Sequence, residues 1–109
     1  MKFSLNTTVI KPENDEQIKN AVILLHGYGG DGKDISMLTL NWKRFLKNTV
    51  FLCPDAQETC SINPIGYKWF DLNTEDTKYI LQESKKAENI LKNYIFDRKR
   101  YFLCLNLLE

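Results

Sequence analysis

Apolar residues form a run of five at positions 21–25, and the run ends at His26. Such a run is typical of a strand buried on both faces, so we expect a strand over about residues 20–26. Four glycines follow between Gly27 and Gly32. Because glycine takes positive φ without steric cost, the chain can turn sharply here before a helix that starts near Asp34. Together, the strand, the turn and the first helical amides predict a corner that stabilises an anion.

Three further segments have strand patterns. Apolar and polar residues alternate over residues 3–9, which predicts an edge or half-exposed strand. Val50–Cys53 predicts a short buried strand that Pro54 stops, and Tyr101–Leu105 predicts a third buried strand. Strands separated by helices favour right-handed crossovers, so the fold class expected is α/β, with a mainly parallel sheet and helices on both faces.

Two helices are expected between these strands. The first has Asp31 or Asp34 as its N-cap, and its apolar stripe comprises Ile35, Leu38, Trp42, Phe45 and Leu46. The second begins at Asn73 or Thr74 and closes at the basic run 98–100, and its apolar face comprises Ile80, Ala87, Leu91, Tyr94 and Ile95. The connection from Asp55 to Asn73 is long for a compact domain, which is typical of a functional loop.

Composition restricts the classes of protein that remain. The 109 residues make at most one domain, and a formal net charge of +1 argues against bulk binding of nucleic acid or of acidic membranes. Three unpaired cysteines favour reduced thiols in the cytoplasm, and one histidine with scattered cysteines gives no metal site. We expect no cofactor, no signal peptide and no membrane-spanning segment.

The glycine turn has one interpretation as a nucleotide- or dinucleotide-binding module. Residues Gly27–Gly32 match G-x-G-x-x-G, and Asp55 lies about where a ribose-binding acid is expected. Asp31, however, places a negative charge where the pyrophosphate would lie. A P-loop also fits poorly, because Asp34 stands where Ser or Thr must hold magnesium.

A second interpretation rests on three blocks of sequence: Leu25–Gly29, Cys53–Ala56 and Asn63–Leu72. In order and spacing they resemble the phospholipase/carboxylesterase family, which includes the acyl-protein thioesterases, from about residue 20 to residue 105. The resemblance implies a single partial α/β-hydrolase domain over residues 1–109, with three αβα layers. It also implies a serine that attacks an ester or thioester carbonyl in a small acyl substrate.

The same resemblance assigns roles to residues of the glycine turn. Two backbone amides hold the oxyanion in this family, and one of them maps onto Tyr28. His26, Gly27 and Gly29 would support that loop. Trp69 and Phe70 are candidates for the substrate pocket, with core packing as the other interpretation.

The catalytic residues themselves are missing from these 109 residues. No G-x-S-x-G occurs, and the strand expected to precede it is followed by Asn106, Leu107, Leu108 and Glu109. Cys60 lies in the loop, where we expect it to be more accessible than Cys53 or Cys104, but no base accompanies it. We therefore expect a fold truncated before the nucleophile elbow, no catalytic triad, an inactive chain, and association through the exposed edge of the sheet.

Overall fold

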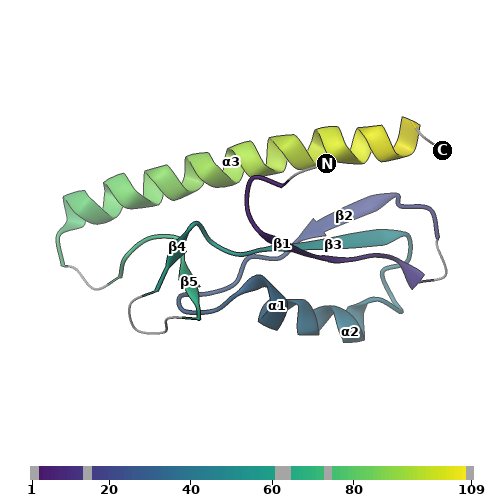
Figure 1. Ribbon diagram of the computed structural model, residues 1–109, viewed down its shortest axis with the longest axis horizontal. Helices are drawn as coiled ribbons and strands as arrows, with labels where there is room; N and C mark the ends of the chain where they lie inside the picture. The colour runs from purple at the N-terminus through teal and green to yellow at the C-terminus, as the bar shows by residue number, and fades with distance from the viewer. Residues whose placement is uncertain (1–2, 14–15, 61–64, 73–74, 108–109) are drawn as a thin grey trace.

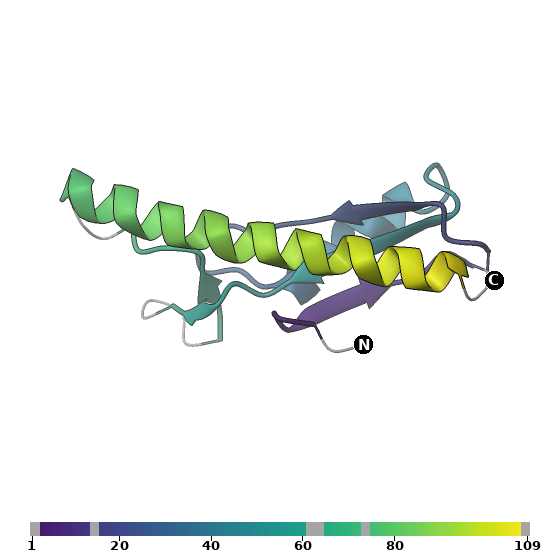
Figure 2. The same ribbon diagram turned by 90° about the horizontal axis from the view of Figure 1, so that it is seen from above.

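The computed structural model describes residues 3–13, 16–60, 65–72 and 75–107, with side chains in the last segment described up to Asp97. Figure 1 shows three layers, in which one long helix covers one face of a sheet and short helices cover the other. Seen from above in Figure 2, the long helix runs along the sheet. The elements in chain order are β1 (Thr7–Ile10), β2 (Asn20–Ile23), α1 (Gly32–Ile35), the 3-10 turn η2 (Ser36–Leu38), α2 (Thr39–Trp42), β3 (Thr49–Pro54), β4 (Glu58–Thr59), β5 (Tyr67–Lys68) and α3 (Thr77–Leu107).

The main sheet has the strand order β1-β3-β2, so β3 pairs with both of the other strands. Val9 of β1 lies opposite Leu52 in an antiparallel pair, and Ile23 of β2 lies opposite Leu52 in a parallel pair. The sheet over the described residues is therefore mixed, with one antiparallel and one parallel pair, and it does not confirm the predicted mainly parallel sheet. Because β1 is antiparallel and β2 parallel to β3, the chain reverses direction between β1 and β2. Residues 24–48 supply the helical crossover that brings β3 back parallel to β2.

Burial divides the strands into a central one and two edges. All six residues of β3 are buried, and Phe51 and Cys53 expose none of their surface, which confirms a buried strand at Val50–Cys53; the strand nevertheless includes Pro54, which was predicted to stop it. β2 instead has two exposed and two half-buried residues, and Leu25 just beyond it is 43% exposed. The prediction of burial on both faces is therefore wrong for β2, because this strand lies at an edge of the sheet.

The long helix α3 begins at an aspartate. The Oδ1 atom of Asp76 accepts hydrogen bonds from the backbone N–H groups of Lys78 (3.0 Å) and Tyr79 (3.3 Å), as an N-cap does. The caps predicted from the sequence, Asn73 and Thr74, lie outside the described residues.

The C-terminal part of α3 differs most from the sequence prediction. The helix continues past the basic run 98–100 to Leu107, so both the predicted helix end and the predicted strand at Tyr101–Leu105 are wrong. No glycine or proline follows Gly66 to stop a helix. A helix also satisfies its backbone hydrogen bonds locally, whereas a strand needs a neighbouring strand.

The face of α3 toward the sheet matches the predicted stripe in its middle. Ala87 is 4% exposed and Tyr94 is fully buried. The hydroxyl groups of Tyr94 and Thr7 are 2.8 Å apart in a hydrogen bond, and the ring of Phe3 stacks on Tyr94 with centroids 6.5 Å apart. Ile95, which was predicted for the same face, is 39% exposed.

The short helices pack on the sheet through small and hydroxylated residues. A Cβ atom added at Gly32 would lie 2.0 Å from the carbonyl oxygen of Cys53, so only glycine permits this approach to β3. Ser36 and Thr39 are buried, and their hydroxyl groups donate to the carbonyl oxygens of Lys33 and Ser36, at 2.5 and 2.7 Å. Hydrogen bonds within the segment thus satisfy the buried hydroxyl groups.

The apolar stripe predicted for this segment does not face the sheet. Leu38, Phe45 and Leu46 are 48%, 76% and 43% exposed, and Trp42 is 38% exposed. The physical reason is the close contact at Gly32, which sets the rotation of the segment and places Ser36 and Thr39 one and two turns further along the same inner side.

The contact at Gly32 yields a prediction about stability. Gly32→Ala places a methyl group into the carbonyl of Cys53, which must shift, so we expect a loss of about 1–3 kcal/mol in the free energy of unfolding. Gly27→Ala is the matched control, because an added Cβ at Gly27 meets nothing within 4 Å. Urea denaturation of both variants measures the difference, and equal stabilities would contradict the close packing.

A second prediction concerns pH. Burial raises the pKa of the Cys53 thiol from 9.0 to about 11. The unfolded chain loses this proton above about pH 9 while the folded chain keeps it, so the stabilisation is complete below pH 9 and is lost as the pH rises to 11. At about 1.4 kcal/mol per pH unit, we expect an extra loss of about 2–3 kcal/mol relative to Cys53→Ala. Urea denaturation between pH 8 and 11 measures it, and parallel pH profiles would contradict it.

Candidate functional site

The segment after β2 forms a tight turn whose conformation depends on glycine. The N–H group of Leu24 still donates to the carbonyl oxygen of Leu52 at 2.9 Å, and the chain leaves the sheet beyond this point. Gly29 has a φ of 79°, in the left-handed region that favours glycine, and the N–H group of Gly30 donates back to the carbonyl oxygen of Gly27 at 3.1 Å. The turn therefore presents Tyr28 between two glycines.

A two-stranded hairpin holds this turn from the side. Thr59 of β4 lies opposite Tyr67 of β5, within the segment 55–73 predicted only as a loop. The N–H group of Gly29 donates to the carbonyl oxygen of Tyr67 at 2.9 Å. The N–H group of Tyr67 donates to the carbonyl oxygen of Gly30, also at 2.9 Å. Two-residue strands give too short a pattern for detection in the sequence, and the aromatic residues at 67–70 were the available signal.

His26 connects the turn to the end of β3. Its side chain is buried, and its Nε2 atom accepts a hydrogen bond from the backbone N–H of Ala56 at 3.0 Å. Nε2 therefore carries no proton in this arrangement, and Nδ1–H donates to the carbonyl oxygen of Gly27 at 2.6 Å. Both ring nitrogens are thus engaged in holding backbone groups, which suits a structural role in the loop.

Trp69 packs on His26 and also holds the backbone at the start of the turn. The two rings stack with centroids 5.2 Å apart and an interplanar angle of 26°, and the indole Nε1–H donates to the carbonyl oxygen of His26 at 2.9 Å. The carbonyl oxygen of Trp69 in turn accepts from Nε2 of Gln57 at 2.6 Å. The side chains of His26 and Trp69 therefore fix each other and the turn.

A small pocket of about 170 Å³ lies beside the glycine turn and is lined by Tyr28, Trp69, Phe70 and Leu72. The structure thus brings the two aromatic residues predicted for the substrate pocket together with Tyr28. All four side chains present mainly apolar surface, which suits an acyl or other apolar group rather than a phosphate. Leu72, which is 56% exposed, was not predicted as a pocket residue.

The first amides of α1 are occupied by the chain's own carboxylates. Oδ1 of Asp55 accepts from the backbone N–H of Gly32 at 2.8 Å, and Oδ1 of Asp31 accepts from that of Asp34 at 2.7 Å. Asp31 is therefore the cap of this segment. Asp55, which the nucleotide interpretation assigned to a ribose, also accepts from Nδ2 of Asn6 at 2.9 Å. The expected anion corner at this helix end is filled from within the fold.

The two cysteines whose side chains the structure describes lie inside the fold. Cys53 and Cys60 are both free thiols and buried, with Cys60 only 2% exposed, so the prediction of an accessible Cys60 is wrong. The backbone N–H of Cys60 donates to the carbonyl oxygen of Gly66 at 2.9 Å, which draws the residue into the hairpin. Within the described residues, no three His, Cys, Asp or Glu side chains are placed to hold a metal ion.

Comparison with known proteins agrees with this geometry. The sequence profile of the phospholipase/carboxylesterase family matches residues 5–96, and the chain belongs to that family. The crystal structure of esterase PE8 superposes with a TM-score of 0.78 at 33% sequence identity, over 90% of this chain. The chain spans 46% of the length of that esterase. The fold is thus part of an esterase-like α/β-hydrolase fold, as the sequence resemblance implied.

The role of His26 can be tested by substitution. His26→Phe keeps a ring against Trp69 but leaves the buried N–H of Ala56 without its acceptor, at a cost of about 1–3 kcal/mol. We expect the free energy of unfolding to fall by this amount in urea denaturation. Tyr79→Phe, at an exposed ring on α3, is the control and should change stability by less than about 0.5 kcal/mol. Equal changes in the free energy of unfolding for the two variants would show that the hydrogen bonds of His26 do not stabilise the turn.

Proposed function

We propose that residues 1–109 supply the oxyanion-stabilising part of a carboxylic-ester or thioester hydrolase site and do not form a catalyst alone. In this proposal the backbone N–H of Tyr28 is one donor to the oxyanion, and His26, Gly27 and Gly29 hold the loop around it. Trp69 and Phe70 contact the acyl group of a small ester or thioester. The nucleophile, its base and the orienting acid come from elsewhere, because the 109 residues contain no G-x-S-x-G.

The observation that carries the proposal is the position of Tyr28. This residue lies in a glycine turn that follows a strand of the esterase-like sheet, and its side chain lines an apolar pocket with Trp69. Four backbone or ring hydrogen bonds anchor the turn, from Gly29, Gly30, His26 and Tyr67. An amide that stabilises a developing charge must be held in place before the reaction, which is what such anchoring supplies.

The nucleotide-binding alternative gains no support from the geometry. A phosphate at this turn would compete with Asp55 for the N–H of Gly32 and with Asp31 for that of Asp34. Both carboxylates would also repel it. No observation on the described residues favours this alternative, so the hydrolase proposal stands without it.

The free edge of β2 is the proposed route to the missing groups. The N–H groups of Asn20 and Leu24 point toward β3, bonding the carbonyl oxygens of Asn48 and Leu52. The N–H groups of a strand point alternately to its two edges. The N–H groups of Ala21 and Ile23 therefore point to the opposite edge, where the described part of the chain places no strand. We propose that a segment carrying the nucleophile pairs there. The free thiols of Cys53 and Cys60 favour the cytoplasm as the location of this chain. Among the described helices, none is long and apolar enough to cross a bilayer.

A fluorophosphonate probe, which labels activated serines, tests both parts of the proposal. We expect no stoichiometric labelling of the 109-residue chain. When the chain is co-expressed with the C-terminal half of a family esterase that carries G-x-S-x-G and the later Asp and His, we expect the added serine to become labelled and p-nitrophenyl ester hydrolysis to appear. Labelling of the chain alone would contradict its inactivity.

Ala21→Pro and Ala21→Val separate edge pairing from other modes of association. Proline at residue 21 removes one of the two outward N–H groups of β2 and leaves the bonds of Asn20 and Leu24 to β3 intact. Ala21→Val keeps the N–H group and is the control. Hydrolysis should be lost with proline and retained with valine, and retention with both would exclude the β2 edge as the docking site.

A further inference from the structure

The pocket beside the glycine turn gathers aromatic side chains. Three of its four lining residues, Tyr28, Trp69 and Phe70, are aromatic, and the fourth is Leu72. They come from two segments that are distant in the sequence, the glycine turn and the chain at the end of β5. The backbone hydrogen bonds between the turn and β5 hold these segments together. The fold therefore brings aromatic surface from both segments into one hollow.

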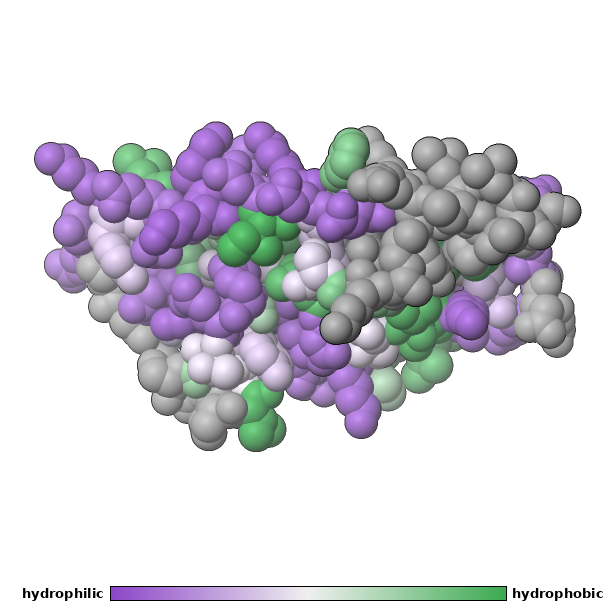
Figure 3. Space-filling model, turned by 45° about the horizontal axis from the view of Figure 1, so that its top comes forward, coloured by the Kyte–Doolittle hydropathy of each residue, from purple (hydrophilic) through white to green (hydrophobic). Residues whose placement is uncertain are grey.

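Two other hollows of the described surface have a different lining. One of them, of about 100 Å³, is lined mainly by charged side chains, which are Glu13, Glu16, Lys43, Arg44 and Lys47. The other lies along residues 81–89 of α3 and includes Lys85 and Lys86. Figure 3 shows that the described part of α3 is largely hydrophilic on its outer side. The aromatic lining is thus particular to the pocket beside the glycine turn.

Trp69 forms a fixed wall of this pocket. One face of its indole ring stacks on the imidazole of His26, with centroids 5.2 Å apart, and its Nε1–H donates to the carbonyl oxygen of His26 at 2.9 Å. The surface that it turns to the pocket is therefore its other face or an edge. Both make favourable contacts with a further aromatic ring, beyond the area that they bury. Because the indole is already held, a ligand does not have to order it.

The size of the pocket matches one ring. Its volume is about 170 Å³, and an apolar cavity of about 150 Å³ is large enough for benzene. Tyr28, Trp69 and Phe70 are half-buried, whereas Leu72 is 56% exposed. Leu72 is therefore the outer wall of the pocket, where a bound group meets solvent.

We propose that this pocket binds a single aromatic ring, with Leu72 covering the ring on its outer side. An aliphatic chain also buries apolar surface there, but it lacks the additional contacts between rings. That the ring belongs to an acyl group rests on the function proposed above, and the substrate is then an ester or thioester of an aromatic acid. Binding of the ring needs no catalytic residue. All four lining residues belong to this chain, so the 109 residues bind the ring alone.

Nuclear magnetic resonance of the ¹⁵N-labelled chain tests the proposal with neutral amides, which carry the carbonyl of an acyl group without a charge. The chain has two tryptophans, and Trp42→Phe assigns their indole N–H signals. Trp42 lies at the end of α2 and does not line the pocket, so its signal is an internal control. We expect benzamide to shift the signal of Trp69 with saturation and to leave that of Trp42 unchanged. No shift at Trp69, or equal shifts of both signals, would overturn the proposal.

Other amides separate a ring from apolar groups in general. Acetamide, which has no ring, should bind at least about 10-fold more weakly than benzamide, because it buries far less apolar surface. Hexanamide and cyclohexanecarboxamide are apolar but not aromatic, and each should bind about 3-fold more weakly than benzamide. Equal or tighter binding of hexanamide would show that the pocket selects a chain, and would overturn the assignment of a ring.

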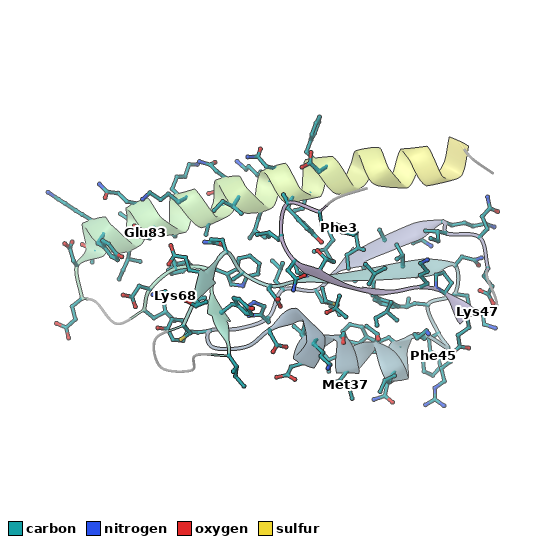
Figure 4. All side chains as sticks on the ribbon, viewed as in Figure 1. Phe3, Met37, Phe45, Lys47, Lys68 and Glu83 are labelled. Carbon is teal, nitrogen blue, oxygen red and sulfur yellow. The ribbon has the colours of Figure 1, made fainter. Side chains whose placement is uncertain are left out.

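Two pairs of variants place the binding at the pocket. Phe70→Leu removes a lining ring and should weaken benzamide binding about 3-fold, whereas Phe45→Leu should have no effect. Phe45 is 76% exposed, and Figure 4 shows it at the short helices, apart from Lys68 on the hairpin next to Trp69. Leu72→Ala should also weaken binding about 3-fold, with Leu81→Ala, at a 69% exposed residue of α3, as its control. Equal effects within either pair would overturn the proposal.

The binding experiment is independent of hydrolysis. Benzamide binding at Trp69, together with no hydrolysis after assembly with a family C-terminal half, would contradict the proposed function and leave the ring pocket standing. Hydrolysis by the assembled protein without benzamide binding by the chain would contradict the ring pocket and leave the proposed function standing.

Discussion

The close approach of Gly32 to the end of β3 is the constraint on which the arrangement depends. The carbonyl oxygen of Cys53 occupies the space that a side chain at residue 32 would need, and the carboxylate of Asp55 holds the amide of Gly32 in place. This contact fixes where the first helical segment begins and how it is rotated. It therefore decides that Ser36 and Thr39 face the sheet while larger apolar residues point outward.

The same end of β3 also positions the glycine turn. Ala56, one residue after Asp55, donates to the ring of His26, and this ring in turn holds Gly27 and stacks on Trp69. Segments from three parts of the chain thus meet at this turn. Under the proposed function, stability and function would share one set of contacts, because the groups that order the turn are the groups that would hold an oxyanion donor in position.

The sequence predicted the elements whose signals are local. Val50–Cys53 is a buried strand because four apolar residues end at a proline, and Asp31 caps the following segment because its side chain reaches the amide of Asp34. The family was also predictable, since three motifs occurred in the right order. Among the site residues, Tyr28, Trp69 and Phe70 were named from the sequence and line one pocket.

The remaining features depend on contacts that a one-dimensional pattern does not contain. The stripe from Ile35 to Leu46 has helical spacing, yet the contact at Gly32 turns much of it to solvent. Tyr101–Leu105 has the composition of a buried strand, but no glycine or proline separates it from the helix before it, and it continues that helix. The β4–β5 hairpin is held by two backbone hydrogen bonds to the turn at Gly29 and Gly30, which no side-chain pattern encodes.

The central claim is that this turn presents a backbone amide to a tetrahedral intermediate. A crystal structure of the chain assembled with a family C-terminal half, after its serine has reacted with a phosphonate, tests this claim directly. The phosphonyl oxygen stands for the oxyanion, and the account predicts that it lies about 2.7–3.1 Å from the backbone nitrogen of Tyr28. An adduct whose oxygen is bonded only by groups of the added half, with Tyr28 directed away from it, would contradict the account.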